Sequence, residues 1–103
     1  MKKNKINQIK KPIVDILKKH RIRKAGIFGS YARGEEKNNS DVDILIMPTE
    51  GMGLEFVEIV LELEEKLGKK VDLVSYRGIH PLLKKYILKD EVRIIWLNLT
   101  FLI

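Results

Sequence analysis

The chain has 103 residues, no cysteine and a formal net charge of +6, with 45% hydrophobic and 33% charged residues. This composition argues against a disordered chain, and the length predicts one domain over residues 1–103. Without cysteine, disulfides and thiolate metal sites are excluded. No apolar segment is long enough to span a membrane and no signal-peptide pattern follows the basic start, so we expect a soluble protein in the cytoplasm.

The positive charge is concentrated at the start of the chain. Residues 1–24 hold ten basic residues and one acidic residue, a balance of +9, whereas residues 25–103 have a balance of −3. Such a segment can attract a polyanion, or it can form the solvated face of a first helix. The second interpretation is favoured, because no aromatic residue alternates with these lysines to stack on nucleic-acid bases.

The start of the chain predicts a helix and then a strand. Pro12 suits the first turn of a helix that runs to about residue 19. Ile6 and Ile9 extend its apolar stripe backward, which indicates a preceding turn that is kinked at Pro12. Residues 24–28 form the first predicted strand, which leads into a glycine-serine turn and a short helix.

The remaining chain alternates strands with helices. Residues 42–47, 71–75 and 92–97 are short apolar runs typical of strands, and residues 54–67 and 81–89 predict helices. This alternation indicates an α/β fold in which helices pack against a sheet. A polar loop at residues 35–39 is expected to close over the functional site.

The longest predicted helix, residues 54–67, divides its apolar and charged positions between two sides. Its glutamates are expected to form a solvated face, and Gly68 is expected to end the helix as a left-handed cap. Its apolar side is predicted to consist of Leu54, Val57, Val60, Leu61 and Leu67.

Several other residues receive structural roles. We assign no ligand role to His20 at the end of the first helix, and we place His80 near the cap of the helix that starts at Pro81. Tyr86 is expected to pack. The apolar terminus, residues 99–103, can add to a sheet edge, pack on the core or bind a partner, and the sequence does not decide among these.

Two carboxylates one residue apart open the second predicted strand. Because side chains alternate along a strand, Asp41 and Asp43 point to the same side, about 6–7 Å apart. Like charges beside a core strand repel and lose hydration, and a divalent cation such as Mg²⁺ relieves both costs. The alternative is that both acids lie in a solvated loop before the strand.

The glycine-serine turn favours a phosphate site. Gly29 allows a tight turn and a close approach to a ligand, and Ser30 offers a hydroxyl and an N–H and can cap the short helix. Arg33, one helical turn later, can reach a phosphate as a fork-shaped donor. A plain turn explains a glycine-serine pair equally well.

Asp72 is a third acid in an unusual setting. It lies inside the apolar run of residues 71–75, where aspartate is depleted. If this strand lies beside residues 42–47, Asp72 joins the acid pair as a third ligand. The alternative is an edge-strand acid that faces water.

The motifs Gly29-Ser30-Tyr31-Ala32-Arg33-Gly34 and Ser40-Asp41-Val42-Asp43, followed by a strand acid, resemble the nucleotidyltransferase superfamily that includes DNA polymerase β. The short chain is similar to the minimal nucleotidyltransferases (MNT), which are encoded as antitoxins beside HEPN-domain toxins. The resemblance implies a mixed sheet with three acids on one face.

The resemblance also implies roles for the motif residues. Asp41, Asp43 and Asp72 would hold two Mg²⁺ ions, and Asp72 would also activate the attacking hydroxyl. Gly29 and Ser30 would bind the β- and γ-phosphates of a nucleotide, and Arg33 and Ser40 would complete the nucleotide-binding set.

The expected function is transfer of AMP from ATP to a hydroxyl of a partner protein. A chain without an acceptor domain must take its acceptor from a partner, and the resemblance implies a HEPN ribonuclease toxin. Two alternatives stay open: an antitoxin that acts by binding alone, and nucleotidyl transfer to RNA or a small molecule.

Overall fold

The computed structural model describes residues 4–96 of the chain, and residues 1–3 and 97–103 lie outside the described part. A four-stranded sheet runs in the order β3-β2-β1-β4. β2 and β3 are parallel neighbours, whereas β1 pairs antiparallel with both β2 and β4. The strands are β1 (Lys24–Phe28), β2 (Val42–Ile46), β3 (Val71–Ser75) and β4 (Val92–Trp96).

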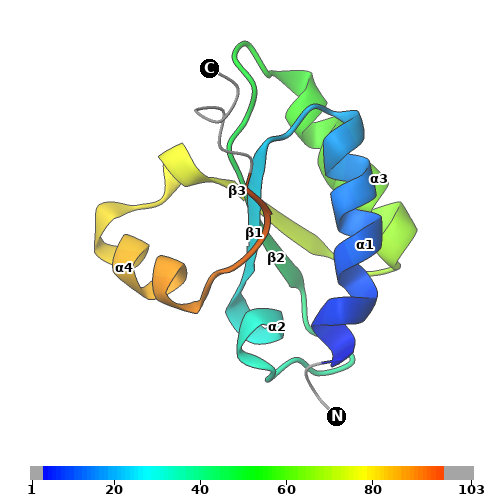
Figure 1. Cartoon of the computed structure of the whole chain (residues 1–103), viewed down its shortest axis with the longest axis vertical. Helices are drawn as coiled ribbons and strands as arrows, with labels where there is room; N and C mark the ends of the chain where they lie inside the picture. Colours follow the sequence, from blue (N-terminus) through cyan, green and yellow to red (C-terminus); the bar gives the residue numbers. More distant parts are fainter. Residues whose placement is uncertain (1–3, 97–103) are drawn as a thin grey trace.

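The two faces of the sheet are covered differently. Figure 1 shows two long helices, α1 and α3, side by side on one face, and α4 on the opposite side. A five-residue helix, α2, follows β1, and a 3₁₀ turn, η1, follows β3. The helices are α1 (Asn4–Lys19), α2 (Gly29–Arg33), α3 (Leu54–Leu67), η1 (Tyr76–Gly78) and α4 (Pro81–Asp90). The chain is thus the expected α/β fold with a mixed sheet.

The hydrophobic core lies between the sheet and the helix pair. On β2 the core residues are Val42, Ile44 and Ile46, which are fully buried against residues such as Leu17 of α1 and Leu63 of α3. Since side chains alternate along a strand, Asp43 points to the opposite face. The strand therefore separates the core from an acid-bearing face, which we call the acid face.

The prediction for the first helix was wrong in its start. α1 is one helix over Asn4–Lys19 with Pro12 inside it, and not a helix that begins at Pro12. Pro12 lacks the N–H that would bond to a carbonyl one turn earlier, so its interior position costs stability. The continuous stripe of apolar residues that α1 buries offsets this cost: Ile6, Ile9, Ile13, Ile16 and Leu17.

The prediction for the apolar side of α3 was also largely wrong. Leu54, Val57 and Leu61 are exposed, at 83%, 52% and 60%. Ile59 and Leu63 are the fully buried residues, and Phe56, Val60 and Leu67 pack beside them. The helix carries apolar residues on two adjacent stripes, and contact with α1 and the sheet selects one. Gly68 ends α3 in the left-handed conformation, as predicted.

The smaller structural predictions had mixed outcomes. His80 does cap α4, where its Nδ1 accepts a hydrogen bond from the N–H of Leu82. Tyr86 does not pack, since it is 62% exposed. The last strand ends at Trp96, and the prediction for residues 99–103 falls outside the described residues. Among residues 4–96 no helix is long and apolar enough to cross a membrane.

Candidate active site

The sheet brings the predicted acids together on the acid face. Asp43 of β2 and Asp72 of β3 are register partners in a parallel pair, so their side chains leave the sheet on the same face. Asp41 lies two residues before Asp43, in the approach to β2. The condition set for Asp72, that its strand lies beside residues 42–47, is therefore met, although β3 is also an edge strand on which Asp72 is exposed.

The three acids differ in exposure. Asp41 and Asp72 are exposed, whereas Asp43 is partly buried. Loss of hydration, followed by the charges of Asp72 and then Asp41, raises the pKa of Asp43 to about 6, against an opposing effect of Arg33. The carboxylate at the centre of the group is therefore the one that gains most from a nearby cation.

The chemistry of the three acids fits a hard divalent cation. Carboxylate oxygens are the ligands that Mg²⁺ prefers, and the pKa of Asp43 is raised by lost hydration and then by the charges of Asp72 and Asp41. In the described part of the chain, however, no three acidic or histidine side chains converge closely enough to form a ready-made metal site. Binding a cation through all three acids would therefore require Asp41 and Asp72 to change side-chain conformation, which their exposure permits.

Gly29 is essential to the shape of this site. It has a φ of +73°, in the left-handed region, and a Cβ built on it would overlap the carboxylate of Asp43. Any other residue would strain the backbone and displace that carboxylate. The turn after β1 therefore lies directly against the central acid, and the expected close approach of Gly29 to a phosphate stays a prediction.

Ser30 lies in α2 but does not cap it. The N-cap position belongs to Phe28, and no side chain makes a cap hydrogen bond there, so the predicted capping role was wrong. The helix begins two residues earlier than a Ser30 cap would require, because Gly29 itself is the first helical residue. Ser30 is partly exposed, one residue beyond Gly29.

Arg33 connects α2 to the helix on the acid face. Its Nε donates to Glu35 at 2.8 Å and its terminal nitrogen donates to Asp90 of α4 at 3.3 Å. Those two hydrogen bonds raise the pKa of Arg33. Because the side chain is partly exposed and the ion pairs are solvated, each pair contributes little stability and can be exchanged.

Ser40 shapes the loop before the acid pair. Its hydroxyl accepts a hydrogen bond from the Lys37 N–H at 2.7 Å, and its own N–H donates to the Lys37 carbonyl at 3.0 Å. Lys69 donates to the Asn38 carbonyl at 2.8 Å and ties the loop to the start of β3. This local turn places Ser40 next to Asp41, and a contact with a nucleotide remains a prediction.

A pair of residues that sequence reasoning missed also lies on the acid face. Gly26 of β1 is the register partner of Leu45, which is on the Asp43 side of β2. A Cβ on Gly26 would overlap the Glu91 carboxylate, so Glu91 lies flat against this part of the sheet. The Tyr76 hydroxyl donates to Glu91 Oε2. The available signal was a glycine inside a strand, which often marks such a close approach.

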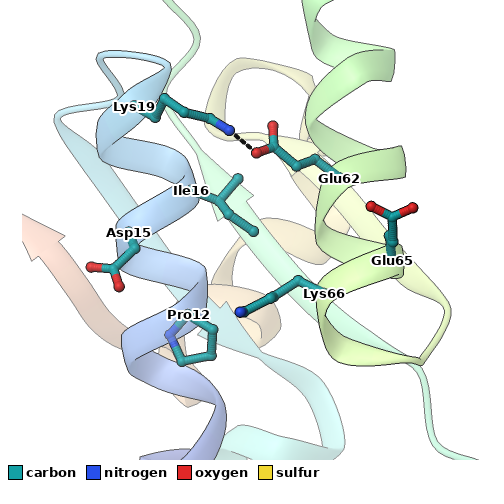
Figure 2. A pocket seen from close by; sticks show the side chains of 7 residues that line it. All are labelled: Pro12, Asp15, Ile16, Lys19, Glu62, Glu65 and Lys66. Carbon is teal, nitrogen blue, oxygen red and sulfur yellow. Dashed lines mark hydrogen bonds and ion pairs between the residues drawn. The ribbon is translucent and has the colours of Figure 1, made fainter.

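The hollow between α1 and α3 lies away from these acids. It has a volume of about 490 Å³ and is lined by the residues drawn in Figure 2: Pro12, Asp15, Ile16, Lys19, Glu62, Glu65 and Lys66. Both helices cover the core face, whereas the acids lie on the other face. None of the predicted site residues lines the hollow.

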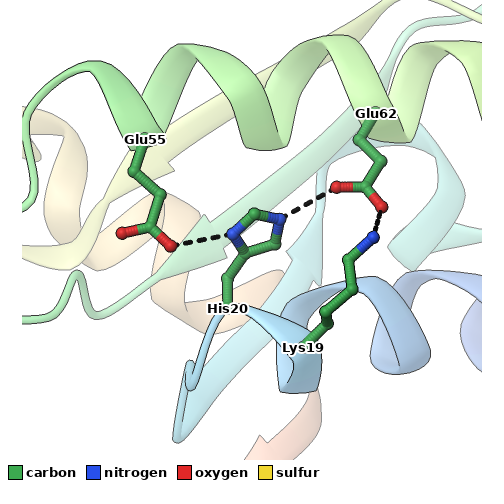
Figure 3. Close-up of polar contacts among 4 residues, drawn as sticks. All are labelled: Lys19, His20, Glu55 and Glu62. Carbon is green, nitrogen blue, oxygen red and sulfur yellow. Dashed lines mark hydrogen bonds and ion pairs between the residues drawn. The ribbon is translucent and has the colours of Figure 1, made fainter.

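His20 has a structural role beyond the end of α1. Its Nδ1 lies 2.8 Å from Glu55 and its Nε2 lies 2.9 Å from Glu62, and Lys19 also contacts Glu62 (Figure 3). Two glutamates of α3 therefore bind α1, and Glu64 accepts the Val71 N–H at 2.9 Å. The prediction that the glutamates form a wholly solvated face was wrong for these three.

Comparison with known proteins agrees with this geometry. Residues 11–98 match the family described as "Polymerase beta, Nucleotidyltransferase". MJ0435 of Methanocaldococcus jannaschii, a candidate protein adenylyltransferase, is 52% identical over 91 residues, 87% of this chain and 98% of the relative. The protein adenylyltransferase MntA of Thermococcus cleftensis is 43% identical over 72 residues, 69% of this chain and 73% of the relative.

Solved structures share the fold. A candidate minimal nucleotidyltransferase has a TM-score of 0.71 and 33% identity, covering 89% of this chain and 95% of that one. A toxin–antitoxin complex with AMP-PNP has a TM-score of 0.76 at 22% identity, covering 88% and 76%. A complex of a tri-AMPylated Shewanella oneidensis HEPN toxin with an MNT antitoxin has a TM-score of 0.70 at 19% identity, covering 94% and 74%. The chain therefore belongs to the polymerase β-like nucleotidyltransferase family and is a minimal nucleotidyltransferase, an enzyme whose relatives include protein adenylyltransferases.

Proposed function

We propose that this enzyme transfers AMP from ATP to a hydroxyl of a HEPN toxin and thereby acts as its antitoxin. The observation that carries the proposal is that Asp43 and Asp72 are paired on neighbouring strands. Next to them lies the turn at Gly29, where a side chain would overlap the Asp43 carboxylate. This arrangement combines metal-binding carboxylates with a backbone that can approach a phosphate closely. The named activity of the relatives supports AMP as the transferred group.

The proposed site needs two Mg²⁺ ions, which Asp41, Asp43 and Asp72 would hold. Bound metal ions stabilise the entering and leaving oxygens of an in-line displacement at phosphorus. Asp43 would be the central ligand, because it is the register partner of Asp72 and lies two residues after Asp41. Asp41 and Asp72, which are exposed, would supply the other carboxylates.

The phosphates of ATP would lie at the turn after β1. The backbone of Gly29 and the N–H and hydroxyl of Ser30 face the β- and γ-phosphates, and Ser40 closes the other side of the nucleotide. Arg33 exchanges its solvated pairs with Glu35 and Asp90 for a phosphate oxygen. This places the leaving pyrophosphate over the end of β1, beside Asp43.

The acceptor hydroxyl would attack from the side of Asp72. Its oxygen forms a bond to the α-phosphorus while the bond from that phosphorus to the bridging oxygen breaks, and pyrophosphate leaves. Asp72 accepts the hydroxyl proton. In-line displacement puts the entering and leaving groups on opposite sides of the phosphorus. The strand order suits this requirement, because β2 lies between β1, where pyrophosphate would leave, and β3, where the hydroxyl would enter.

The partner class is proposed from the related complexes. The structural neighbours include an AMPylated HEPN toxin bound to an MNT antitoxin, and that modification is the product expected here. The acceptor is therefore a protein hydroxyl, with nucleic acid as the less favoured alternative. Because ATP is held inside cells, the proposed reaction places the enzyme in the cytoplasm.

The test is transfer of label from α-labelled ATP. The pure protein, Mg²⁺ and a lysate of its source are incubated beside two variants, Asp43→Asn and the control Glu58→Gln, which changes an exposed acid of α3. We expect one labelled protein band with the wild type and the control, and none with Asp43→Asn or without Mg²⁺.

Three results would contradict parts of the proposal. Label in RNA or in a small molecule would show that the acceptor is not a protein. Equal labelling by Asp43→Asn would remove the catalytic assignment. Toxin neutralisation by Asp43→Asn without any labelling would favour an antitoxin that acts by binding alone.

A further inference from the structure

We propose that Glu91, held by Tyr76 against Gly26, binds the ribose hydroxyls of the nucleotide and lets the enzyme distinguish ribonucleotides from deoxyribonucleotides. The inference rests on the proposed function, because it takes the positions of the α-phosphate and the pyrophosphate from it. It adds a nucleoside subsite to the phosphate site.

The position of Glu91 on the acid face follows from strand pairing. Leu45 is two residues after Asp43 on β2, so the two side chains leave the strand on the same face. Gly26 is the register partner of Leu45, and paired residues share a face. The Glu91 carboxylate occupies the space of the missing Gly26 side chain, which places it on the acid face.

The spacing between Glu91 and the metal-binding acid suits a nucleoside. Asp43 is level with Phe28 of β1, and Glu91 lies over Gly26, two residues earlier. Two residues of a strand span about 7 Å. That span is comparable to the separation of the α-phosphate from the ribose hydroxyls of a nucleotide.

The direction of attack leads the nucleoside toward Glu91. The leaving and entering oxygens define an axis that crosses the strands from β1 to β3, as proposed above. The 5′ oxygen of the nucleoside is an equatorial substituent, so it leaves the phosphorus at a right angle to that axis. Along the sheet, one such direction runs off the strand ends, and the other runs along β2 from Asp43 toward the position where Glu91 lies against Gly26.

Glu91 is oriented and still able to accept hydrogen bonds. Tyr76 donates to Oε2, which leaves Oε1 for a ligand, and the side chain is only partly buried. In the described part of the chain Glu91 has no ion pair. Dinucleotide-binding folds likewise use a carboxylate to accept a hydrogen bond from a ribose hydroxyl.

Tyr76 acts as a positioning residue, and it is itself held in place. Its ring meets the edge of Trp96 with centroids 5.9 Å apart at 84°, and the Arg93 guanidinium lies 3.9 Å from the Trp96 ring. Burial, and then the hydrogen bond to Glu91, raises the pKa of the Tyr76 hydroxyl above its ordinary range. Tyr76 therefore remains a donor to Glu91 at all ordinary pH values.

Nucleotide binding tests the proposal without any acceptor protein. In Mg²⁺, calorimetric titration compares ATP with 2′,3′-dideoxy-ATP for the wild type, Glu91→Gln, Tyr76→Phe and the control Glu58→Gln. We expect the wild type and the control to bind ATP about 10-fold or more tightly than the dideoxy analogue, the size expected for a hydrogen bond to a carboxylate.

The variants separate binding from positioning. Glu91→Gln should bind the dideoxy analogue as the wild type does and lose most of its preference for ATP, and Tyr76→Phe should lose part of it. Circular dichroism and thermal unfolding confirm that each variant is folded. Comparison of 2′-deoxy-ATP with 3′-deoxy-ATP then identifies the hydroxyl that Glu91 binds.

Three results would overturn the inference, and the third can be distinguished from the first two. A wild type that binds ATP and the dideoxy analogue equally, or a folded Glu91→Gln variant that keeps the wild-type preference, would refute the ribose subsite alone. A wild type that binds neither nucleotide would refute the proposed nucleotide site and the ribose subsite with it.

Discussion

Replacing Asp43 with asparagine should stabilise the metal-free protein while it abolishes nucleotidyl transfer. The pKa of Asp43 is raised from 3.8 to about 6, first by lost hydration and then by Asp72 and Asp41. The folded state therefore disfavours the ionised carboxylate at neutral pH. Asparagine has nearly the same shape and carries no charge, so it removes this cost.

The magnitude follows from linkage between protonation and folding. A pKa shift of one unit corresponds to about 1.4 kcal/mol, so the shift sets an upper limit of about 3 kcal/mol. Because Asp43 is only partly buried, solvent screening reduces the expected gain to about 1 kcal/mol. In a domain of this size that gain raises the melting temperature by about 5 °C.

The pH dependence has a definite sign. Between pH 4 and 6 the unfolded chain releases the Asp43 proton while the folded chain retains it, so the wild type loses stability as pH rises through this range. The advantage of Asp43→Asn should therefore be largest above pH 6 and vanish toward pH 4. Mg²⁺ should reverse the order at pH 7.5, because it stabilises only the protein that can bind it.

Thermal unfolding in EDTA and in Mg²⁺ at several pH values measures these effects, with Glu58→Gln as the control. Equal melting temperatures of Asp43→Asn and wild type at pH 7.5 in EDTA would refute the predicted free-energy cost of the ionised Asp43 carboxylate in the folded protein. An equal response of both proteins to Mg²⁺ would refute the assignment of Asp43 as a metal ligand.

Four further substitutions, two of them a matched pair on α3, test other parts of the structure. Gly29→Ala should lower the free energy of unfolding by about 1–2 kcal/mol, because alanine is unfavourable in the left-handed conformation and its Cβ would contact the Asp43 carboxylate. The same substitution should remove the Mg²⁺-dependent rise in melting temperature, and an unchanged Mg²⁺ response would contradict this. In urea denaturation, Leu63→Ala should lower the free energy of unfolding by about 2–5 kcal/mol, and Leu61→Ala by less than about 0.5 kcal/mol, since only Leu63 is buried. Similar losses for the two variants would contradict the observed packing of α3. His20→Ala should cost about 1–2 kcal/mol by the same measurement, because two α3 carboxylates lose their partner on α1; a loss no larger than that of the exposed control Lys11→Ala would show that the contacts contribute little.

The motif residues could be predicted from the sequence because they are local. The left-handed conformation of Gly29 belongs to a tight turn formed by its immediate neighbours in the chain. The acids stand beside or within apolar runs, so they are visible as breaks in the hydrophobic pattern. The alternation of strand and helix in the sequence also identified the α/β fold. These features depend on near neighbours in the chain, and most of the element boundaries followed from them.

Tertiary structure decided which residues meet. α3 presents two apolar stripes of similar hydrophobicity, and only packing against α1 and the sheet selected Ile59 and Leu63 over Leu54 and Leu61. The Tyr76–Glu91 hydrogen bond joins the segment after β3 to the residue before β4, and no local sequence pattern predicts it. Contacts between distant segments depend on strand order and register, which are set by the free energy of the whole packed molecule and not by any one segment.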